Sequence, residues 1–247
     1  MPNSEELIWT PQMVARFWAH EAKTPENYFG FQVGMAVVRH MRRHLASVRR
    51  IADYGAGTVY LVEDLLASGY RCGAVEFCET AVAALRARYA ARPGFLGAWE
   101  VDEATAHGER FDAVFLMEVV EHLYDDDLNI CLQNIRRLLV PGGLLIVTTP
   151  NSENLSLSMI PSPESGRLFH RWQHVRVWTK ETLAQALAGQ GYATVDAGIT
   201  DFAFSPAAHR RTYGLPLRVL RALAKRGLAF MRPGVPLPHL YIVARSD

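Results

Sequence analysis

The feature that most constrains the fold is an alternation of short apolar runs and helical segments that begins at residue 49. The runs RRIADY, YRCGAVEF, FDAVFLM and GLLIVTT are separated by segments with helical spacing around 59–68, 78–91 and 126–139. Apolar runs that alternate with amphipathic helices are typical of βαβ units, in which helices cover both faces of a parallel sheet. The alternation therefore predicts an α/β domain.

Further elements flank this region. Residues 11–48 carry apolar residues at helical spacing and predict two helices, whereas 151–178 has no clear period. Thr179 can cap a helix that runs to 188, and apolar runs predict strands at 192–199 and 239–244. We expect an amino-terminal helical cap at 1–48 and one main domain at 49–247.

Composition and charge limit the classes of protein to which this chain can belong. The 247 residues are 49% hydrophobic, which suffices for one buried core. Lys and Arg number 26 against 25 Asp and Glu, so overall charge does not favour a nucleic-acid partner. We expect a cytoplasmic protein for three reasons. The three cysteines show no pairing pattern, the amino terminus is unlike a signal peptide, and there is no long apolar run.

A glycine-containing turn follows the first predicted strand. Gly55 and Gly57 leave room for a ligand to approach backbone N–H groups and the amino terminus of the next helix. Glu76 ends the following strand, 19 residues after Gly57, where a carboxylate can accept hydrogen bonds from a ribose. Tyr60 stands where a dinucleotide-binding turn has its last glycine, so we expect a nucleoside ligand without a pyrophosphate.

The segments IADYGAGTVYLVEDLLASGY and GAVEF resemble the first two motifs of class I S-adenosylmethionine-dependent methyltransferases, over about residues 49–200. The resemblance implies a Rossmann-like seven-stranded sheet with the helical cap, and S-adenosylmethionine as cofactor. It also implies that Asp53 supports the glycine turn, Glu76 binds the ribose and Phe77 packs on the adenine. The full set of implied cofactor residues is Asp53, Tyr54, Gly55, Ala56, Gly57, Glu76, Phe77, Asp102 and Met117.

One position departs from the pattern of that family. Val59 stands where the family usually has a third glycine. This departure motivates an alternative, namely a protein that binds S-adenosylmethionine without catalysis.

The segment EVVEHL follows the strand that ends at Met117, at the sheet edge where open α/β folds bind ligands. Together with the following sequence up to TPNSENL, it resembles the ubiquinone-biosynthesis O-methyltransferase branch. We expect transfer of a methyl group to a hydroxyl of a small molecule, such as a quinone, a natural product or a sugar. His122 is the candidate base, Glu121 orients it, and His174 is a further catalytic candidate.

A second interpretation of these side chains remains open. Carboxylates and imidazoles are reasonable ligands for a divalent metal ion, and a metal would lower the pKa of an acceptor hydroxyl. The spacing resembles that of metal-assisted small-RNA 2′-O-methyltransferases, although the residues alone favour a metal less than a simple base. The candidate ligands are Glu118, Glu121, His122 and His174.

The segment FHRWQHVRVWT at 169–179 suggests one wall of an acceptor pocket, through His170 and Trp172. Aromatic residues in such loops are also common as packing anchors, so that alternative stays open. In the amino-terminal helices, Tyr28, Phe29 and Gln32 are candidate lid residues.

The carboxyl-terminal segment is strongly basic. Between Phe202 and Ser246 there are eight Lys and Arg and no acid, and a helix is predicted within an insertion at about 205–236. Arg218, Arg221 and Lys225 share one face of that helix, opposite a mostly apolar face. Three explanations remain open: a solvated helix packed on the sheet, peripheral contact with anionic membrane or a lipid-linked acceptor, and an acidic substrate.

Overall fold

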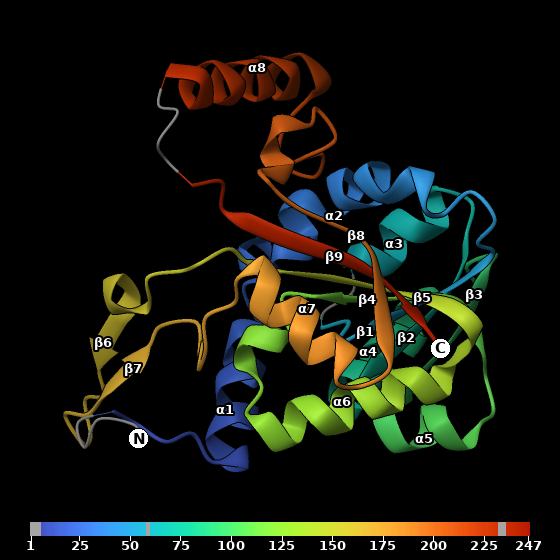
Figure 1. Ribbon diagram of the computed structural model, residues 1–247, viewed down its shortest axis with the longest axis horizontal. Coiled ribbons are helices and arrows are strands. Elements are labelled where there is room, and N and C mark those ends of the chain that lie inside the picture. The colour runs from blue at the N-terminus through green and yellow to red at the C-terminus, as the bar shows by residue number, and fades with distance from the viewer. Residues whose placement is uncertain (1–5, 58–59, 232–235) are drawn as a thin grey trace.

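The fold is built on one seven-stranded sheet, described by a computed structural model that covers residues 6–57, 60–231 and 236–247. The strand order is β3-β2-β1-β4-β5-β9-β8, and β9 is antiparallel to both of its neighbours. This confirms the predicted Rossmann-like sheet (Figure 1). The strands are β1 Arg50–Tyr54, β2 Arg71–Glu76, β3 Phe95–Glu100, β4 Phe111–Met117, β5 Leu139–Pro150, β8 Tyr192–Thr200 and β9 His239–Ser246.

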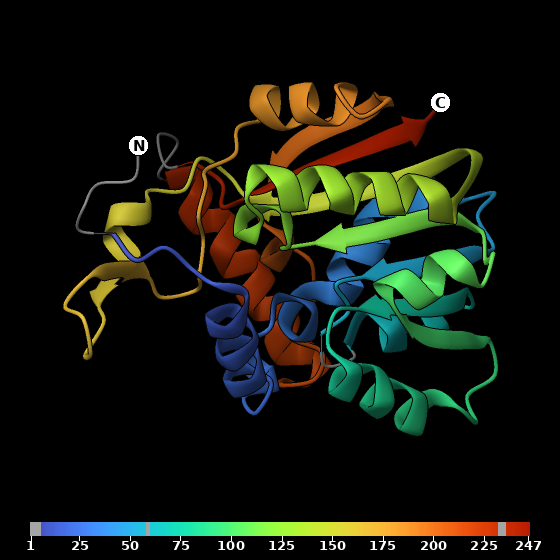
Figure 2. The ribbon, with the colours of Figure 1, turned by 90° about the horizontal axis from the view of Figure 1, so that it is seen from below.

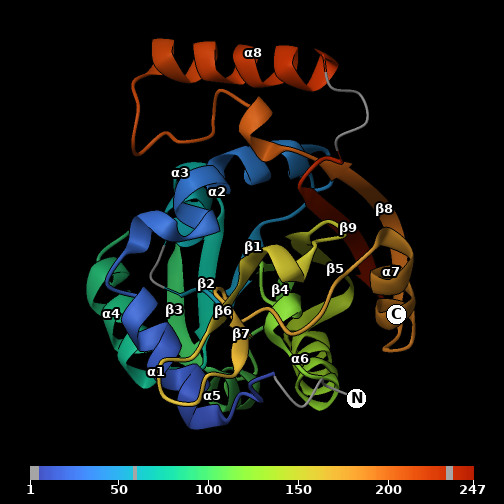
Figure 3. The same ribbon diagram turned by 90° about the vertical axis from the view of Figure 1, so that its left-hand side faces the viewer.

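Helices cover both faces of the sheet (Figure 3). Successive residues of a strand point to opposite faces, so Ile51 joins the core under α2, α3 and α4, while Ala52 joins the core under α5, α6 and α7. The helices are α1 Pro11–Glu21, α2 Phe29–His40, α3 Tyr60–Ala67, α4 Glu79–Tyr89, α5 Val101–Ala106, α6 Asp125–Leu138, α7 Lys180–Ala188 and α8 Leu215–Met231.

The two helices predicted in 11–48 differ in how they pack. Val33, Val37 and Met41 of α2 and the turn that follows it are buried in the same core as the sheet. Helix α1 has no buried residue, and its Trp18 reaches toward the segment that follows β4. Helix α2 therefore supports the sheet, whereas α1 covers its carboxyl edge. The division of the chain into a cap at 1–48 and a main domain at 49–247 stays a prediction.

The stretch 151–178 is more ordered than its sequence suggested. It contains a 3-10 turn at Leu155–Ser158 and an antiparallel pair, β6 Met159–Pro161 with β7 Leu168–His170. The expectation of an irregular segment was therefore wrong for these residues. Figure 2 shows this hairpin extending beyond the sheet, where Leu168 O of β7 accepts a hydrogen bond from Leu7 N.

The basic segment is attached to the domain through a buried carboxylate. Asp64 of α3 is fully buried, and its Oδ1 accepts hydrogen bonds from Arg210 Nε at 2.7 Å and Arg211 Nη2 at 2.8 Å. Glu63 lies 3.8 Å from Arg210 and 3.7 Å from Arg211, so two carboxylates face two of the eight basic residues. Helix α8 follows within the predicted insertion, and no helix in the described ranges is long and apolar enough to cross a membrane.

Candidate active site

The glycine turn lies directly after β1 and is tightly enclosed. Gly55 and Gly57 have φ values of 74° and 54°, which glycine adopts without strain. A Cβ at Gly55 would lie 2.8 Å from Val119 Cγ2, and one at Gly57 would lie 3.1 Å from Tyr28 Cε1. A side chain at Gly55 would therefore overlap Val119, and one at Gly57 would crowd the Tyr28 ring. Val59, the position that departs from the family pattern, lies outside the described residues.

Glu76 ties this turn to the end of β2. Its Oε2 accepts a hydrogen bond from Gly57 N at 2.8 Å, and its Oε1 accepts one from Phe77 N at 2.8 Å. Burial raises the pKa of Asp53 to about 8, with a further contribution from Glu76, and burial also raises the pKa of Glu76. Because a buried and a half-buried carboxyl group stand near each other, a cationic ligand would be stabilised at this turn.

The other predicted cofactor residues lie at the same edge of the sheet. Phe77 is 56% exposed and free to pack on a planar ligand, and its ring contacts Tyr54 edge-on at 5.9 Å. The Tyr54 ring is itself buried in the core under α6, so only its backbone belongs to the turn. Asp102 is exposed in the first turn of α5, and Met117 ends β4. Ala56 lies in the turn, where its N–H donates to Val75 O.

A second group of side chains follows β4. Glu118 has φ of 52°, a left-handed conformation that is uncommon for a residue other than glycine. Glu121 is 1% exposed, and its Oε2 accepts a hydrogen bond from Thr149 Oγ1 at 2.9 Å. Its Oε1 lies 3.9 Å from His122 Nε2. The structure therefore places Glu121 and His122 near each other, at a separation longer than a hydrogen bond, and the orienting role of Glu121 stays a prediction.

His122 is held by contacts on both sides. Its Nδ1 lies 3.3 Å from Gln173 O, which can only accept, so the proton belongs on Nδ1 and the lone pair on Nε2. The rings of Trp18 and His174 each lie 4.9 Å from the His122 ring, measured between centroids. Trp18 also donates a hydrogen bond to Gln173 Oε1 at 3.1 Å, which fixes α1 over the cluster.

Glu153 is a member of this cluster that the sequence analysis missed. Its Oε2 lies 2.5 Å from His174 Nδ1, and its Oε1 lies 3.5 Å from His170 Nε2. His170 Nδ1 accepts hydrogen bonds from the backbone of Trp172 and His174, so its proton belongs on Nε2, facing Glu153. The position of Glu153, shortly after the carboxyl end of β5, was the signal in the sequence.

These groups form what we call the Glu/His cluster, made up of Glu118, Glu121, Glu153, His122, His170 and His174. Burial raises the pKa of Glu118 to about 8 and that of Glu121 well above its usual range. It lowers the pKa of His122 to about 3 and that of His170 to about 4. Within the described chain, Glu118 Oε1, Glu121 Oε1 and His170 Nε2 are buried without a hydrogen-bond partner. Unsatisfied atoms that converge in this way are typical of a site that receives a ligand.

The candidate lid residues do not all face this cluster. Tyr28 lies beside Gly57 and 6.2 Å from the Trp18 ring, between the glycine turn and the cluster. Phe29 instead packs on Phe202 and His239, and Gln32 donates to Glu26 O. Trp172 is 37% exposed, with Arg171 over its ring.

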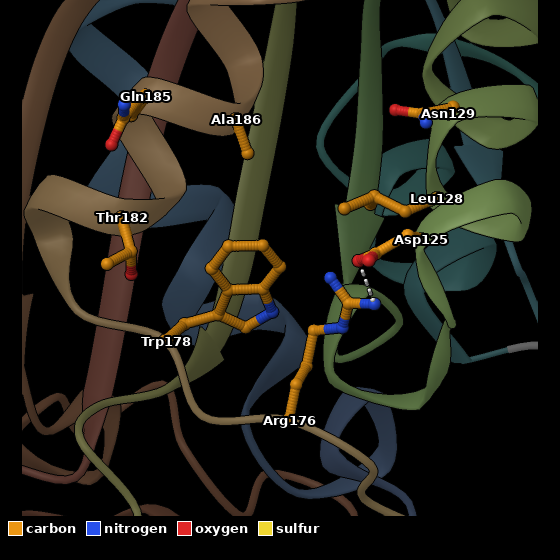
Figure 4. A pocket seen from close by; sticks show the side chains of 8 residues that line it. All are labelled: Asp125, Leu128, Asn129, Arg176, Trp178, Thr182, Gln185 and Ala186. Carbon is orange, nitrogen blue, oxygen red and sulfur yellow. Dashed lines mark hydrogen bonds and ion pairs between the residues drawn. The ribbon is translucent and has the colours of Figure 1, made fainter. Parts of the chain in front are cut away.

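A surface pocket of about 460 Å³ lies between α6 and α7 (Figure 4). Arg176 closes one side through an ion pair with Asp125 at 2.8 Å and packs over Trp178. None of the predicted site residues lines it. It is therefore separate from the glycine turn and the Glu/His cluster.

Comparison with known proteins agrees with this architecture. Relatives named ubiquinone biosynthesis O-methyltransferase include one from Chelativorans sp. (strain BNC1), 32% identical over 60% of this chain, and one from Mesorhizobium japonicum, 30% identical over 65%. The chain spans 60% and 66% of their lengths. A solved 1,6-didemethyltoxoflavin-N1-methyltransferase from Burkholderia thailandensis has the same fold, with a TM-score of 0.58 at 19% identity over 98% of this chain and 92% of that one.

A family profile described as a methyltransferase domain matches residues 21–197, which include α2, the glycine turn and most of the Glu/His cluster's supporting strands. That match covers well over half of the chain. The protein therefore belongs to the methyltransferase domain family.

Proposed function

We propose that the protein is an S-adenosylmethionine-dependent methyltransferase that methylates a hydroxyl group of a small molecule, such as a quinone, a natural product or a sugar. The observation that carries this proposal is the placement of the Glu/His cluster beside the glycine turn, with Val119 packed against Gly55 and Tyr28 against Gly57. Methyl transfer needs a nucleoside-binding turn and a proton-accepting group at one edge of the sheet.

The residues of the glycine turn fit the cofactor. S-adenosylmethionine, when bound, supplies an electrophilic methyl group on a positively charged sulfur. The turn excludes side chains at Gly55 and Gly57, and the carboxyl groups of Asp53 and Glu76 favour positive charge nearby. Phe77 offers an exposed aromatic face for the adenine.

The Glu/His cluster fits removal of the acceptor proton. As the new oxygen–carbon bond forms and the sulfur–carbon bond breaks, the hydroxyl proton must pass to a base. His122 has its Nε2 lone pair available, although burial lowers its pKa to about 3 and makes it a weak base. His174 is the second candidate for this role, because the Glu153 carboxylate holds its Nδ1 and leaves Nε2 as the proton acceptor. Glu121 and His122 then line the acceptor site.

A direct test combines binding and turnover. Calorimetry with S-adenosylmethionine should show saturable binding that Gly57→Ala weakens. Purified protein with S-adenosylmethionine and a panel of hydroxylated acceptors should release S-adenosylhomocysteine only with certain acceptors. Failure to bind S-adenosylmethionine at millimolar concentration would contradict the proposal. Binding without turnover on phenols, catechols, sugars and alcohols would instead support the non-catalytic alternative.

A metal-assisted reaction is the second candidate, favoured by one geometric observation. Ligand atoms of Glu121, His122 and His174 lie within 4.8 Å of one another, and Glu118 and Glu121 each have a buried oxygen without a partner. Both histidines also have Nδ1 against an acceptor, as metal-binding histidines usually do. These four residues would hold a divalent ion, which would polarise the acceptor hydroxyl.

Chelation separates the two candidates. Full turnover after treatment with excess EDTA would exclude the metal-assisted reaction. If activity is lost, and Mg²⁺, Mn²⁺ or Zn²⁺ restores it, the second candidate replaces the first. Because the two candidates share the glycine turn, S-adenosylmethionine binding should survive chelation in either case.

A further inference from the structure

Helix α8 differs from an ordinary surface helix in that its apolar face is exposed to water. Of its residues 215–231, Ala222 alone is buried. Polar side chains near it hold the helix to the domain: Lys225 Nζ lies 2.9 Å from Asp201 Oδ2, and the Arg221 guanidinium lies 4.7 Å from the Tyr213 ring centroid. The cationic face predicted from the sequence is therefore directed in part toward the protein.

The apolar face of α8 is left exposed. Leu220 is 63% exposed, Leu223 59%, Phe230 88% and Met231 70%. A surface helix of a globular protein normally turns such a face toward the core. A contiguous exposed apolar face of this kind indicates a surface that binds a protein or a membrane.

The charge around this face selects the kind of partner. Helix α8 carries Arg218, Arg221, Lys225 and Arg226, and the chain has no acid between 202 and 246. Lys225 is paired with Asp201, but two copies of α8 packed face to face would still bring six arginines together with no acid on the helices. An anionic lipid surface supplies both an apolar layer and negative headgroups.

The position of α8 permits such contact. Figures 1 and 3 show the helix at the periphery of the molecule, beyond α2 and separated from the sheet. The chain that leaves α8 re-enters the sheet at His239, which pairs with Pro150 at the carboxyl end of β5. Helix α8 is thus connected to the edge of the sheet that carries the Glu/His cluster.

We infer that α8 is an interfacial anchor that binds anionic membrane, with Leu220, Leu223, Phe230 and Met231 inserted among the lipid chains and the exposed Arg221 and Arg226 at headgroup level. Long cationic side chains reach the headgroups while their stems stay in the apolar layer. The insertion is peripheral, because the helix lies along the surface and does not span it.

The test is flotation of the full-length protein with vesicles of phosphatidylcholine alone or with 30% phosphatidylglycerol. Wild type should float with the anionic vesicles and much less with the neutral ones, and 0.5 M salt should weaken binding. The double variant Leu223→Glu/Phe230→Glu should lower the bound fraction at least about tenfold, because two inserted side chains become charged. Leu157→Glu, an 83% exposed leucine far along the chain in the 155–158 turn, is the matched control and should float like wild type.

Three results would overturn the inference. One is wild-type protein that stays with the unbound fraction at every vesicle concentration. Another is flotation that the double variant leaves unchanged. The third is a wild-type dimer in light scattering that becomes a monomer in the double variant, with no vesicle binding by either protein. In that case α8 would be an interface between copies. Circular dichroism of each variant checks that the fold is intact.

Discussion

Glu153 Oε2 lies 2.5 Å from His174 Nδ1, so the carboxylate defines which nitrogen of this imidazole carries the proton. His170 faces the other oxygen of the same carboxylate at 3.5 Å. A histidine with its Nδ1 proton on a carboxylate has Nε2 available for a substrate proton or for a metal ion. Glu153 is therefore a positioning residue whichever of the two candidate reactions operates.

Replacing Glu153 with Gln should lower kcat about 100-fold and leave affinity for S-adenosylmethionine unchanged, because the carboxylate contacts His174 and not the glycine turn. Steady-state kinetics and calorimetry measure the two effects. Glu164→Gln, at an exposed position of the same segment, is the control and should behave like wild type.

The same variant distinguishes the candidate reactions. If excess divalent cation restores its turnover, Glu153 supports a metal ligand; if cation has no effect, it supports a base. A turnover number within twofold of wild type would remove Glu153 from both mechanisms.

Gly55→Ala should weaken cofactor binding and destabilise the fold, because the added Cβ would lie 2.8 Å from Val119 Cγ2. Gly108 is a matched control, since it has φ of 70° against 74° at Gly55 and nothing within 4 Å of a Cβ. Gly108→Ala should cost about 1 kcal/mol from backbone strain alone. Gly55→Ala should cost more, and Val119→Ala combined with it should recover the excess. Denaturant unfolding of wild type, the two single glycine variants and the double variant measures these differences. Equal stability of Gly55→Ala and Gly108→Ala would contradict this account.

Asp64→Ala should lower the free energy of unfolding by about 3 kcal/mol, because it leaves Arg210 and Arg211 without their buried acceptor. Asp126→Ala, in the exposed first turn of α6, should cost no more than about 0.5 kcal/mol. Thermal and urea unfolding provide the comparison. Equal losses in the two variants would show that the Asp64 pair does not anchor the basic segment.

Asp53 should make the cofactor-free protein less stable as the pH rises. Its pKa is about 8 when folded and near 3.8 when unfolded, so the folded state binds the additional proton between these values. The histidines with lowered pKa values act in the opposite direction only below about pH 6.5; they are His40, His122, His170, His209 and His239.

The informative window is therefore pH 6.5 to 8. Over this window the stability of wild type relative to Asp53→Asn should fall by about 2 kcal/mol. Melting temperatures of both proteins measure the difference. A difference that is constant with pH would mean that Asp53 is ionised throughout the window.

Most strands of the sheet were predictable because they carry apolar runs, but β3, Phe95–Glu100, was not among the predicted runs. The predicted run FDAVFLM coincides with β4, Phe111–Met117. The β6–β7 hairpin was not predictable in this way, because its three-residue strands lie outside both cores and need no period. The orientation of α8 was also not predictable. A helical pattern defines two faces, but it does not say which of them contacts Asp201 and Tyr213.

The candidate site was predictable where its residues are contiguous. Glu118, Glu121 and His122 follow one strand and were found together. Glu153 was missed because it reaches His174 only after the chain has passed through the β6–β7 hairpin. Such convergence depends on tertiary structure, which no local spacing records.

The left-handed backbone at Glu118 has a consequence for protein engineering. A half-buried residue that is held at φ of 52° and has a buried oxygen without a hydrogen-bond partner lowers the stability of the fold that contains it. In a library selected only for resistance to heat, Gly or Asn at position 118 should be enriched early. Enrichment at position 118, but not at the exposed positions of α6, would locate the functional centre from stability alone, with no substrate in the assay.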